Sequence, residues 1–125
     1  MIRKKWLAVV ALFGGSLCAQ NPIVPPGVFA ADPEGHQWKD GRLYLYVSRD
    51  ESPDFYCSWR YDLLSTDDLR NWTIHRDVFA SKGPNDEVPY SDGELYASDA
   101  AYKDGKYYLY YSMRDAIDEG VAVAD

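Results

Sequence analysis

Residues 39–48 read KDGRLYLYVS, and residues 103–112 repeat the pattern as KDGKYYLYYS with seven of ten positions identical. In both copies an Asp-Gly pair comes directly before a run rich in tyrosine and leucine. Asp-Gly readily adopts the positive φ angles of a tight hairpin turn, and aromatic residues favour β-strands. Each copy is therefore predicted to form the second strand of a β-hairpin.

The correspondence between the two copies extends to both sides. A short segment headed by an aspartate precedes each turn, with Asp32 in the first copy and Asp99 in the second. A third strand is expected at 62–67 and again at 120–125, and in the first copy a fourth follows at 72–75. Four antiparallel strands per unit, repeating at roughly 60 residues, are typical of the blades of a β-propeller.

The predicted fold class is therefore all-β, a propeller of which this chain holds about the first one and three-quarter blades. Propellers close with about 4 to 8 blades. We expect residues 20–125 to be the N-terminal part of a longer propeller domain. The alternative is a complete β-sandwich of seven strands with an accidental repeat, and the matching flanks of the two copies disfavour it.

The N-terminus has the layout of a secretory signal peptide, predicted to span residues 1–19. Basic residues at 3–5 precede an apolar run at 6–17, and small residues follow it. Twelve apolar residues are fewer than the ~20 that cross a bilayer, so no membrane span is expected. Cys18 offers a lipoprotein anchor, but the residues before it fit that signal poorly. We expect a periplasmic or extracellular protein.

Net charge and cysteine content limit the classes of partner and cofactor that this chain is expected to bind. The 13 Lys+Arg and 20 Asp+Glu give a net charge of −7, and loss of the three basic residues at 3–5 would change this to −10. Such an acidic surface disfavours nucleic acid and suits a neutral ligand such as a carbohydrate. Cys57 would be the only cysteine left, which excludes a disulfide framework. His36 and His75 have no companion ligands at metal-binding spacing, so neither a metal nor a cofactor is predicted.

The two aspartates are the candidates for chemistry. The first strand of a propeller blade lines the central channel, so Asp32 and Asp99 are expected to point toward one shared site. Glycoside hydrolysis commonly uses one carboxylic acid to protonate the leaving oxygen and one carboxylate to activate water or attack carbon. A third carboxylate can raise the pKa of the acid by repulsion. Both aspartates also have a plain structural interpretation, Asp32-Pro33 as a turn and Asp99 as a partner of local backbone.

Two further residues are candidates for substrate binding. Asp50 follows the inner strand of the first unit at the channel end, where it could bind a sugar hydroxyl or simply face solvent. Tyr96 could stack on a sugar ring, although most of the eleven tyrosines must serve the core. Glu119 is expected on the surface, away from the axis, and is not taken as an acid.

Several short motifs occur in a fixed order along nearly the whole chain after the signal peptide. They are Asn21-Pro22, Ala31-Asp32-Pro33, Asp40-Gly41 with its Tyr-rich strand, Ser65-Thr66-Asp67-Asp68-Leu69, Asn71-Trp72, Leu95-Tyr96-Ala97-Ser98-Asp99 and Lys103-Asp104-Gly105-Lys106-Tyr107-Tyr108. In order and spacing they resemble glycoside hydrolase family 43, five-bladed β-propellers that include β-xylosidases, α-L-arabinofuranosidases and arabinanases.

The resemblance implies an inverting hydrolase of arabinose- or xylose-containing polysaccharides or oligosaccharides. By it, Asp32 would be the general base that deprotonates the attacking water, and Asp99 would tune the pKa of the general acid. The family's acid is a glutamate on the third blade, so this chain is expected to end before it and to be inactive alone.

Two alternatives to this interpretation stay open. One is a sugar-binding propeller without catalytic activity. The other is a propeller related to the β-fructosidases, whose retaining mechanism uses an Asn-Asp-Pro-Asn context where this chain has residues 30–34, Ala-Ala-Asp-Pro-Glu. The family's usual Trp-Ala-Pro before the second aspartate is replaced by Tyr96-Ala97-Ser98, which leaves the choice of sugar open.

Overall fold

The computed structural model describes residues 23–51, 54, 56–114 and 119–125. The predicted signal peptide at 1–19, including Cys18, lies outside these residues. All regular secondary structure in the described part is β, in seven strands. The described residues contain no helix with the length and apolar character needed to cross a membrane.

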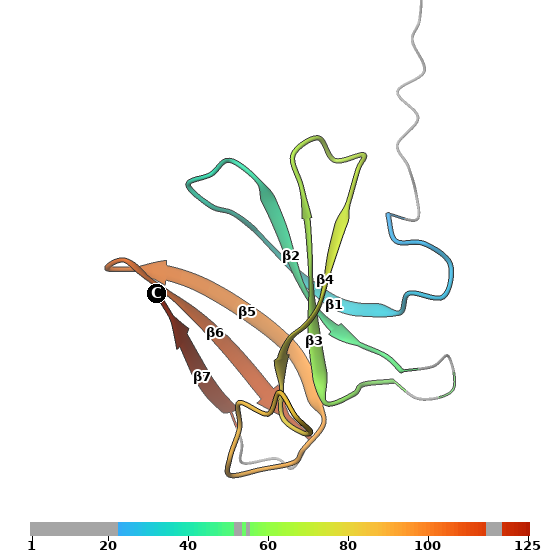
Figure 1. The fold of residues 1–125 in the computed structure, drawn as a ribbon, viewed down its shortest axis with the longest axis vertical. Coiled ribbons are helices and arrows are strands. Elements are labelled where there is room, and N and C mark those ends of the chain that lie inside the picture. Colours follow the sequence, from blue (N-terminus) through green and yellow to red (C-terminus); the bar gives the residue numbers. More distant parts are fainter. Residues whose placement is uncertain (1–22, 52–53, 55, 115–118) are drawn as a thin grey trace, which may run out of the picture.

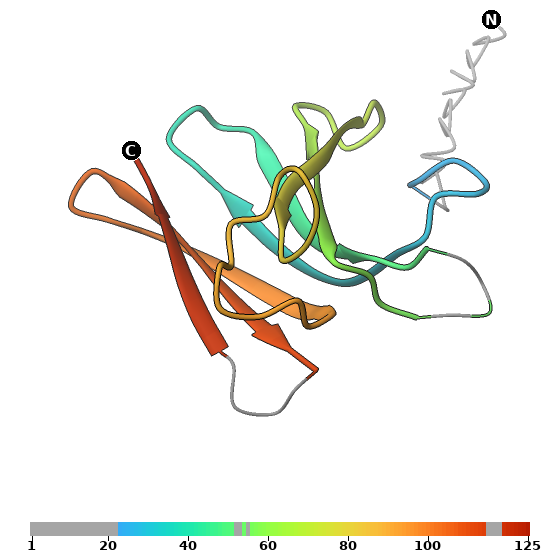
Figure 2. The ribbon, with the colours of Figure 1, turned by 60° about the horizontal axis from the view of Figure 1, so that its bottom comes forward.

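The strands form two antiparallel sheets that lie next to one another (Figures 1 and 2). The first sheet has the order β1 (Ala30–Gln37), β2 (Leu43–Arg49), β3 (Arg60–Thr66) and β4 (Thr73–Ala80). The second has the order β5 (Leu95–Lys103), β6 (Lys106–Met113) and β7 (Glu119–Ala124). The predicted hairpins and third strands are confirmed to within two residues, and β4 runs further than expected. Each sheet contains only consecutive strands, as in propeller blades, whereas sandwiches commonly exchange strands between sheets.

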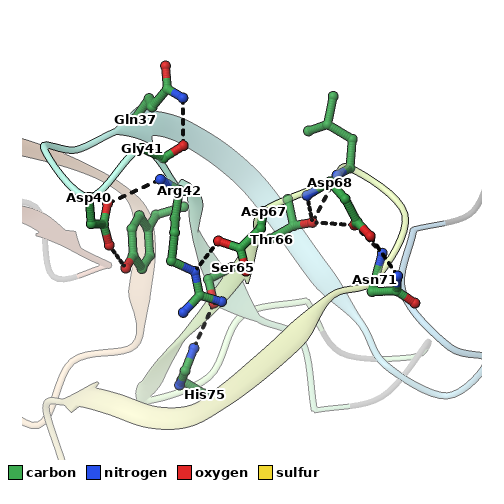
Figure 3. Close-up of polar contacts among 12 residues, drawn as sticks. Gln37, Asp40, Gly41, Arg42, Ser65, Thr66, Asp67, Asp68, Asn71 and His75 are labelled. Carbon is green, nitrogen blue, oxygen red and sulfur yellow. Dashed lines mark hydrogen bonds and ion pairs between the residues drawn. The ribbon is translucent and has the colours of Figure 1, made fainter.

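The two Asp-Gly turns differ although their sequences match. The second is a two-residue turn in which Asp104 has φ 52° and Gly105 φ 86°. In the first, β1 and β2 are joined by residues 38–42, and only Gly41 has a positive φ, 81°. There Oδ1 of Asp40 accepts the N–H of Arg42 at 3.2 Å (Figure 3). The expectation that both residues of each pair adopt positive φ is therefore confirmed only for the second turn.

The turn between β3 and β4 is held by side chains that cap its backbone (Figure 3). Oγ1 of Thr66 accepts the N–H groups of Asp68 and Leu69 at 3.2 and 3.0 Å. Oδ1 of Asp68 accepts those of Arg70 and Asn71 at 2.9 and 2.8 Å. The hydrogen bonds from Asn71 and Arg70 hold the pKa of Asp68 well below its usual range, because they favour the charged carboxylate.

The core lies between the two sheets and takes residues from both. Its buried members are Tyr61, Phe79, Val88, Leu95, Tyr111 and Met113. The Phe79 ring lies 5.8 Å from that of Tyr61 and 4.8 Å from that of Tyr111, centroid to centroid. The sheets therefore pack through aromatic side chains, and β5 lies against β1 and β2 of the neighbouring sheet.

A buried carboxylate fixes the interior of the first sheet. Asp62 is 2% exposed and accepts hydrogen bonds from Nε of Arg49 at 3.0 Å and Nη1 of Arg76 at 2.6 Å. It also accepts the backbone N–H of Asp77 at 3.0 Å. Burial alone would raise the pKa of Asp62, but the hydrogen bonds from Arg49, Asp77 and Arg76 outweigh it and lower the pKa. This group joins β2, β3 and β4.

Candidate active site

Asp32 sits at a break in the ladder between β1 and β2. The pairing passes from Ala31 opposite Ser48 to Glu34 opposite Tyr46, which leaves a bulge at Asp32. The φ angle of Asp32 is 49°, in the left-handed region that few residues other than glycine, asparagine and aspartate adopt. Bulges redirect a side chain, and backbone strain of this kind is concentrated at functional sites. The exposed Asp32 side chain is therefore directed by a local distortion of the strand.

Two buried residues, Cys57 and Tyr61, are influenced by the charge of Asp32. Burial raises the pKa of the Cys57 thiol, and the charge of Asp32 adds a smaller contribution. Burial likewise raises the pKa of Tyr61, and Asp32 again adds to it. Oη of Tyr61 donates a long hydrogen bond, 3.5 Å, to the carbonyl of Ala97 in β5. Asp32 thus interacts electrostatically with two buried side chains, and one of them, Tyr61, is hydrogen-bonded to the second sheet.

Asp50 organises the loop that carries Cys57. Its Oδ1 accepts the N–H of Cys57 at 2.6 Å, and its own N–H donates to the carbonyl of Phe29 at 3.2 Å. Cys57 has φ 72°, so this hydrogen bond holds a residue in an unfavourable backbone conformation. The structure therefore gives Asp50 a structural task. Its binding of a sugar hydroxyl stays a prediction.

Tyr96 lies half-buried in the register shift of β5, close to the same loop. Burial raises its pKa, and the nearby Cys57 and Tyr56 add to the effect. An ion pair between Nη1 of Arg114 and Oε2 of Glu94, 3.2 Å apart, lies in the same neighbourhood. Of the predicted site residues, Asp50 bonds Cys57 directly, and Asp32 and Tyr96 interact with Cys57 electrostatically.

Asp99 does not hold the position in its sheet that Asp32 holds in the first. Tyr46 and Tyr110 are equivalent in the repeat, since both stand seven residues after the lysine that begins each copy. Glu34 pairs with Tyr46, and Asp99 pairs with Tyr110. Asp99 therefore corresponds to Glu34, and the expectation that the two aspartates head their strands equivalently is wrong. Asp32 lies two residues before Glu34, at the bulge of β1, so an aspartate near the start of each inner strand does not mark the same place in the two sheets.

Asp99 makes polar contacts with His36 of β1 and with its own neighbour in the chain. Oδ1 of Asp99 lies 3.0 Å from Nε2 of His36 and accepts the N–H of Ala100 at 2.6 Å. Oε1 of Glu34 lies 3.6 Å from the same His36 nitrogen. The sequence did not indicate that His36 and Asp99 are neighbours, because they are 63 residues apart in the chain. Only the placement of Glu34 and His36 on one face of the strand could be inferred, from the alternation of side chains along it.

A cavity of about 540 Å³ opens on the second sheet, and Asp99, Tyr111 and Glu119 are among the residues that line it. Glu119 is exposed, as expected. Asp32 is not among the residues that line this cavity. The expectation that Asp32 and Asp99 share one site stays a prediction.

Two consecutive antiparallel sheets, with a strained aspartate on the inner strand of the first, define an all-β protein of the propeller-like class. The model for glycosyl hydrolases family 43 matches residues 19–125, and the chain belongs to this family.

Named relatives point the same way. The chain is 34% identical over 113 residues to a xylosidase/arabinosidase of Bacteroides ovatus and 36% identical over 112 residues to xylosidase/arabinosidase 43A of Humicola insolens. It is 32% identical over 111 residues to a β-xylosidase of Xylanibacter ruminicola. These matches cover 80%, 78% and 80% of this chain. The chain spans about a third of each relative, 33%, 33% and 34%.

Proposed function

We propose that this chain is part of an exported, inverting glycoside hydrolase with a five-bladed propeller that cleaves xylose- or arabinose-containing oligosaccharides or polysaccharides. The observation that carries the proposal is the position of Asp32, exposed on a left-handed bulge of the inner strand. The names of the relatives, xylosidase/arabinosidase and β-xylosidase, support the substrate class.

In this mechanism the carboxylate of Asp32 accepts a proton from the water that attacks the anomeric carbon. Inverting enzymes place the base and the acid about 6.5–9.5 Å apart, so that a water fits between the base and the sugar. The other carboxylates beside Cys57 already have partners, since Asp50 accepts the Cys57 N–H and Glu94 pairs with Arg114. We propose that the acid comes from a part of the propeller outside residues 23–125.

The half-buried Tyr96 is proposed to form one wall of the sugar site. Its ring lies near the loop that Asp50 closes, and an aromatic face suits the apolar face of a pyranose or furanose. Asp99 would adjust the pKa of the acid only if that acid lies near the second sheet. Its contact with His36 instead suggests a different task, which is argued below.

The test uses the full-length protein and nitrophenyl xyloside and arabinofuranoside as substrates. Asp32→Ala should lower kcat by about 10²–10⁴-fold, the usual value of a general base. Asp104→Ala is the matched control, because Asp104 is also exposed and also has a left-handed backbone, φ 52°. NMR of the first product anomer should show inversion.

Three outcomes would overturn the proposal. Full activity of Asp32→Ala would remove the base assignment, and a product with retained configuration would point to a covalent intermediate. A wild-type protein that binds xylo-oligosaccharides without releasing sugar would show a binding module in place of an enzyme.

A further inference from the structure

Three potential ligand atoms from two sheets converge beside the central strands. Nε2 of His36 lies 3.0 Å from Oδ1 of Asp99 and 3.6 Å from Oε1 of Glu34, and all three atoms lie within 4.8 Å of one another. The His36 side chain is 25% exposed, so the site is accessible to a small ion.

The imidazole is held in place by aromatic neighbours. The His36 ring stacks on Trp38 with centroids 4.8 Å apart and planes 3° apart, and its edge faces Tyr46 at 6.1 Å. Nε1 of Trp38 donates to Oη of Tyr46 at 3.2 Å, and Trp38 meets Tyr107 of the second sheet edge to face at 5.4 Å. The Nε2 atom is thus oriented toward the two carboxylates before any ligand arrives, which lowers the entropic cost of binding.

The charges of this group are not balanced by its own members. A single imidazole nitrogen can carry one proton and donate it along one direction, so it serves one carboxylate well and the other poorly. Two carboxylates so close repel one another, and an imidazolium could offset only one of them. A divalent cation in the same place would offset both.

The spacing of the donors matches a particular ion. Ligand atoms about 2.0–2.2 Å from a tetrahedral Zn²⁺ lie roughly 3.3–3.6 Å from one another. The separations of the two carboxylate oxygens from Nε2 are 3.0 and 3.6 Å, and the two oxygens lie within 4.8 Å of each other, so side-chain rotations would bring all three atoms onto one ion. Imidazole nitrogen favours zinc over calcium or magnesium, which prefer oxygen ligands alone.

We propose that Glu34, His36 and Asp99 form a Zn²⁺ site that joins β1 to β5, with a fourth position open to water. Asp32 is not one of the three ligands, and the site does not depend on the proposed hydrolase activity. The ion would tie the two sheets together across their inner strands. Because only the folded chain brings residues 34, 36 and 99 together, binding should also stabilise the fold.

The test is calorimetric titration of the full, untagged and chelator-treated chain with Zn²⁺. One ion should bind per chain and raise the Tm. Glu34→Gln, His36→Ala and Asp99→Asn should each weaken Zn²⁺ binding by at least about tenfold. Loss of a group that only hydrogen-bonds to a metal ligand already weakens metal binding by about that factor. Substitution with Co²⁺ should give visible absorption bands that His36→Ala abolishes.

His75→Ala and Glu87→Gln are the controls. His75 is the other histidine of the chain and contacts Ser65 at 2.9 Å, and Glu87 is exposed. Equal Zn²⁺ affinity in His36→Ala and wild type, or no binding by wild type, would overturn the proposal. If His36→Ala does not fold, Glu34→Gln and Asp99→Asn decide the matter, since both preserve side-chain shape.

Discussion

Glu34 and Asp99 occupy equivalent positions in the two sheets, and both carboxylates approach Nε2 of the same imidazole, that of His36. The repeat thus supplies two acidic groups, whereas the histidine is present once. His36 pairs with Tyr44, and the equivalent residue of the second sheet is Ala101, opposite Tyr108. One imidazole therefore faces two acids, because residues 34–37 and 99–102 match in backbone pairing but not in side chains.

Replacement of Asp62 by asparagine should destabilise the first sheet strongly. The variant keeps the shape of the side chain but removes the buried charge that Arg49 and Arg76 share, which leaves Arg49 paired with Asp77 alone. Breaking one side of a buried pair typically costs about 3–5 kcal/mol in the free energy of unfolding. Urea denaturation should show this loss. Asp67→Asn, which removes an exposed partner of Arg42, should change the midpoint little, and equal effects of the two changes would contradict the assignment.

Gly120→Ala should destabilise the second sheet. Gly120 pairs with Tyr111 across β6 and β7, and a Cβ atom at this position would overlap the Tyr111 ring. Such crowding of a packed ring costs about 1–3 kcal/mol. Gly35→Ala is the control, because its Cβ would lie 3.2 Å from the flexible end of Leu45. Thermal melts of both variants should separate the two cases, and a melt of Gly120→Ala as high as that of Gly35→Ala would refute the packing argument.

The contribution of Asp68 to stability should disappear in acid. Its pKa is lowered in the folded chain, chiefly by the N–H groups of Asn71 and Arg70. A carboxyl group whose pKa is lowered by folding stabilises the folded chain at pH values above its pKa in the unfolded chain, about 3.9. This stabilisation is lost as the pH falls toward and through its pKa in the folded chain. Asp68→Ala should therefore lower the urea midpoint at pH 7 and differ less from wild type below pH ~4.

Asp67→Ala is the control for Asp68, since Asp67 adjoins it but bonds the side chain of Arg42. A difference between Asp68→Ala and wild type that stays constant from neutral to strongly acidic pH would show that the hydrogen bonds to the charged carboxylate are not its cause.

Asp50 can be tested as a loop anchor by two substitutions. Asp50→Ala removes the acceptor of the Cys57 N–H and should cost about 1–3 kcal/mol, the penalty for an unpaired buried donor. Asp50→Asn keeps an acceptor oxygen and should retain most of the stability. If both variants are as stable as wild type and differ only in KM for the sugar, the residue binds substrate instead of holding the loop.

Much of the local structure could be predicted from the sequence. The repeat with its Asp-Gly pairs predicted the hairpins of β1–β2 and β5–β6, because turn preference and strand propensity act over a few residues. The inner-strand position of Asp32 followed from the same pattern. Its left-handed φ did not, since no residue type marks a bulge with certainty.

The registers of the two sheets could not be counted from the turns. Identical Asp-Gly pairs close a five-residue loop in the first sheet and a two-residue turn in the second. Counted five residues back from each Asp-Gly pair, Asp99 would match Gly35, whereas the pairing of the strands makes it match Glu34. A single-residue error in register changes which face a side chain occupies.

The sequence by itself determined the strands, their order and the family, because periodic pattern, turn residues and motif order are all local properties of the chain. Only the tertiary structure decided that Cys57 and Tyr61 lie near Asp32 and that His36 meets Asp99. These contacts depend on how the two sheets pack against one another, and the aromatic core that they share sets that packing.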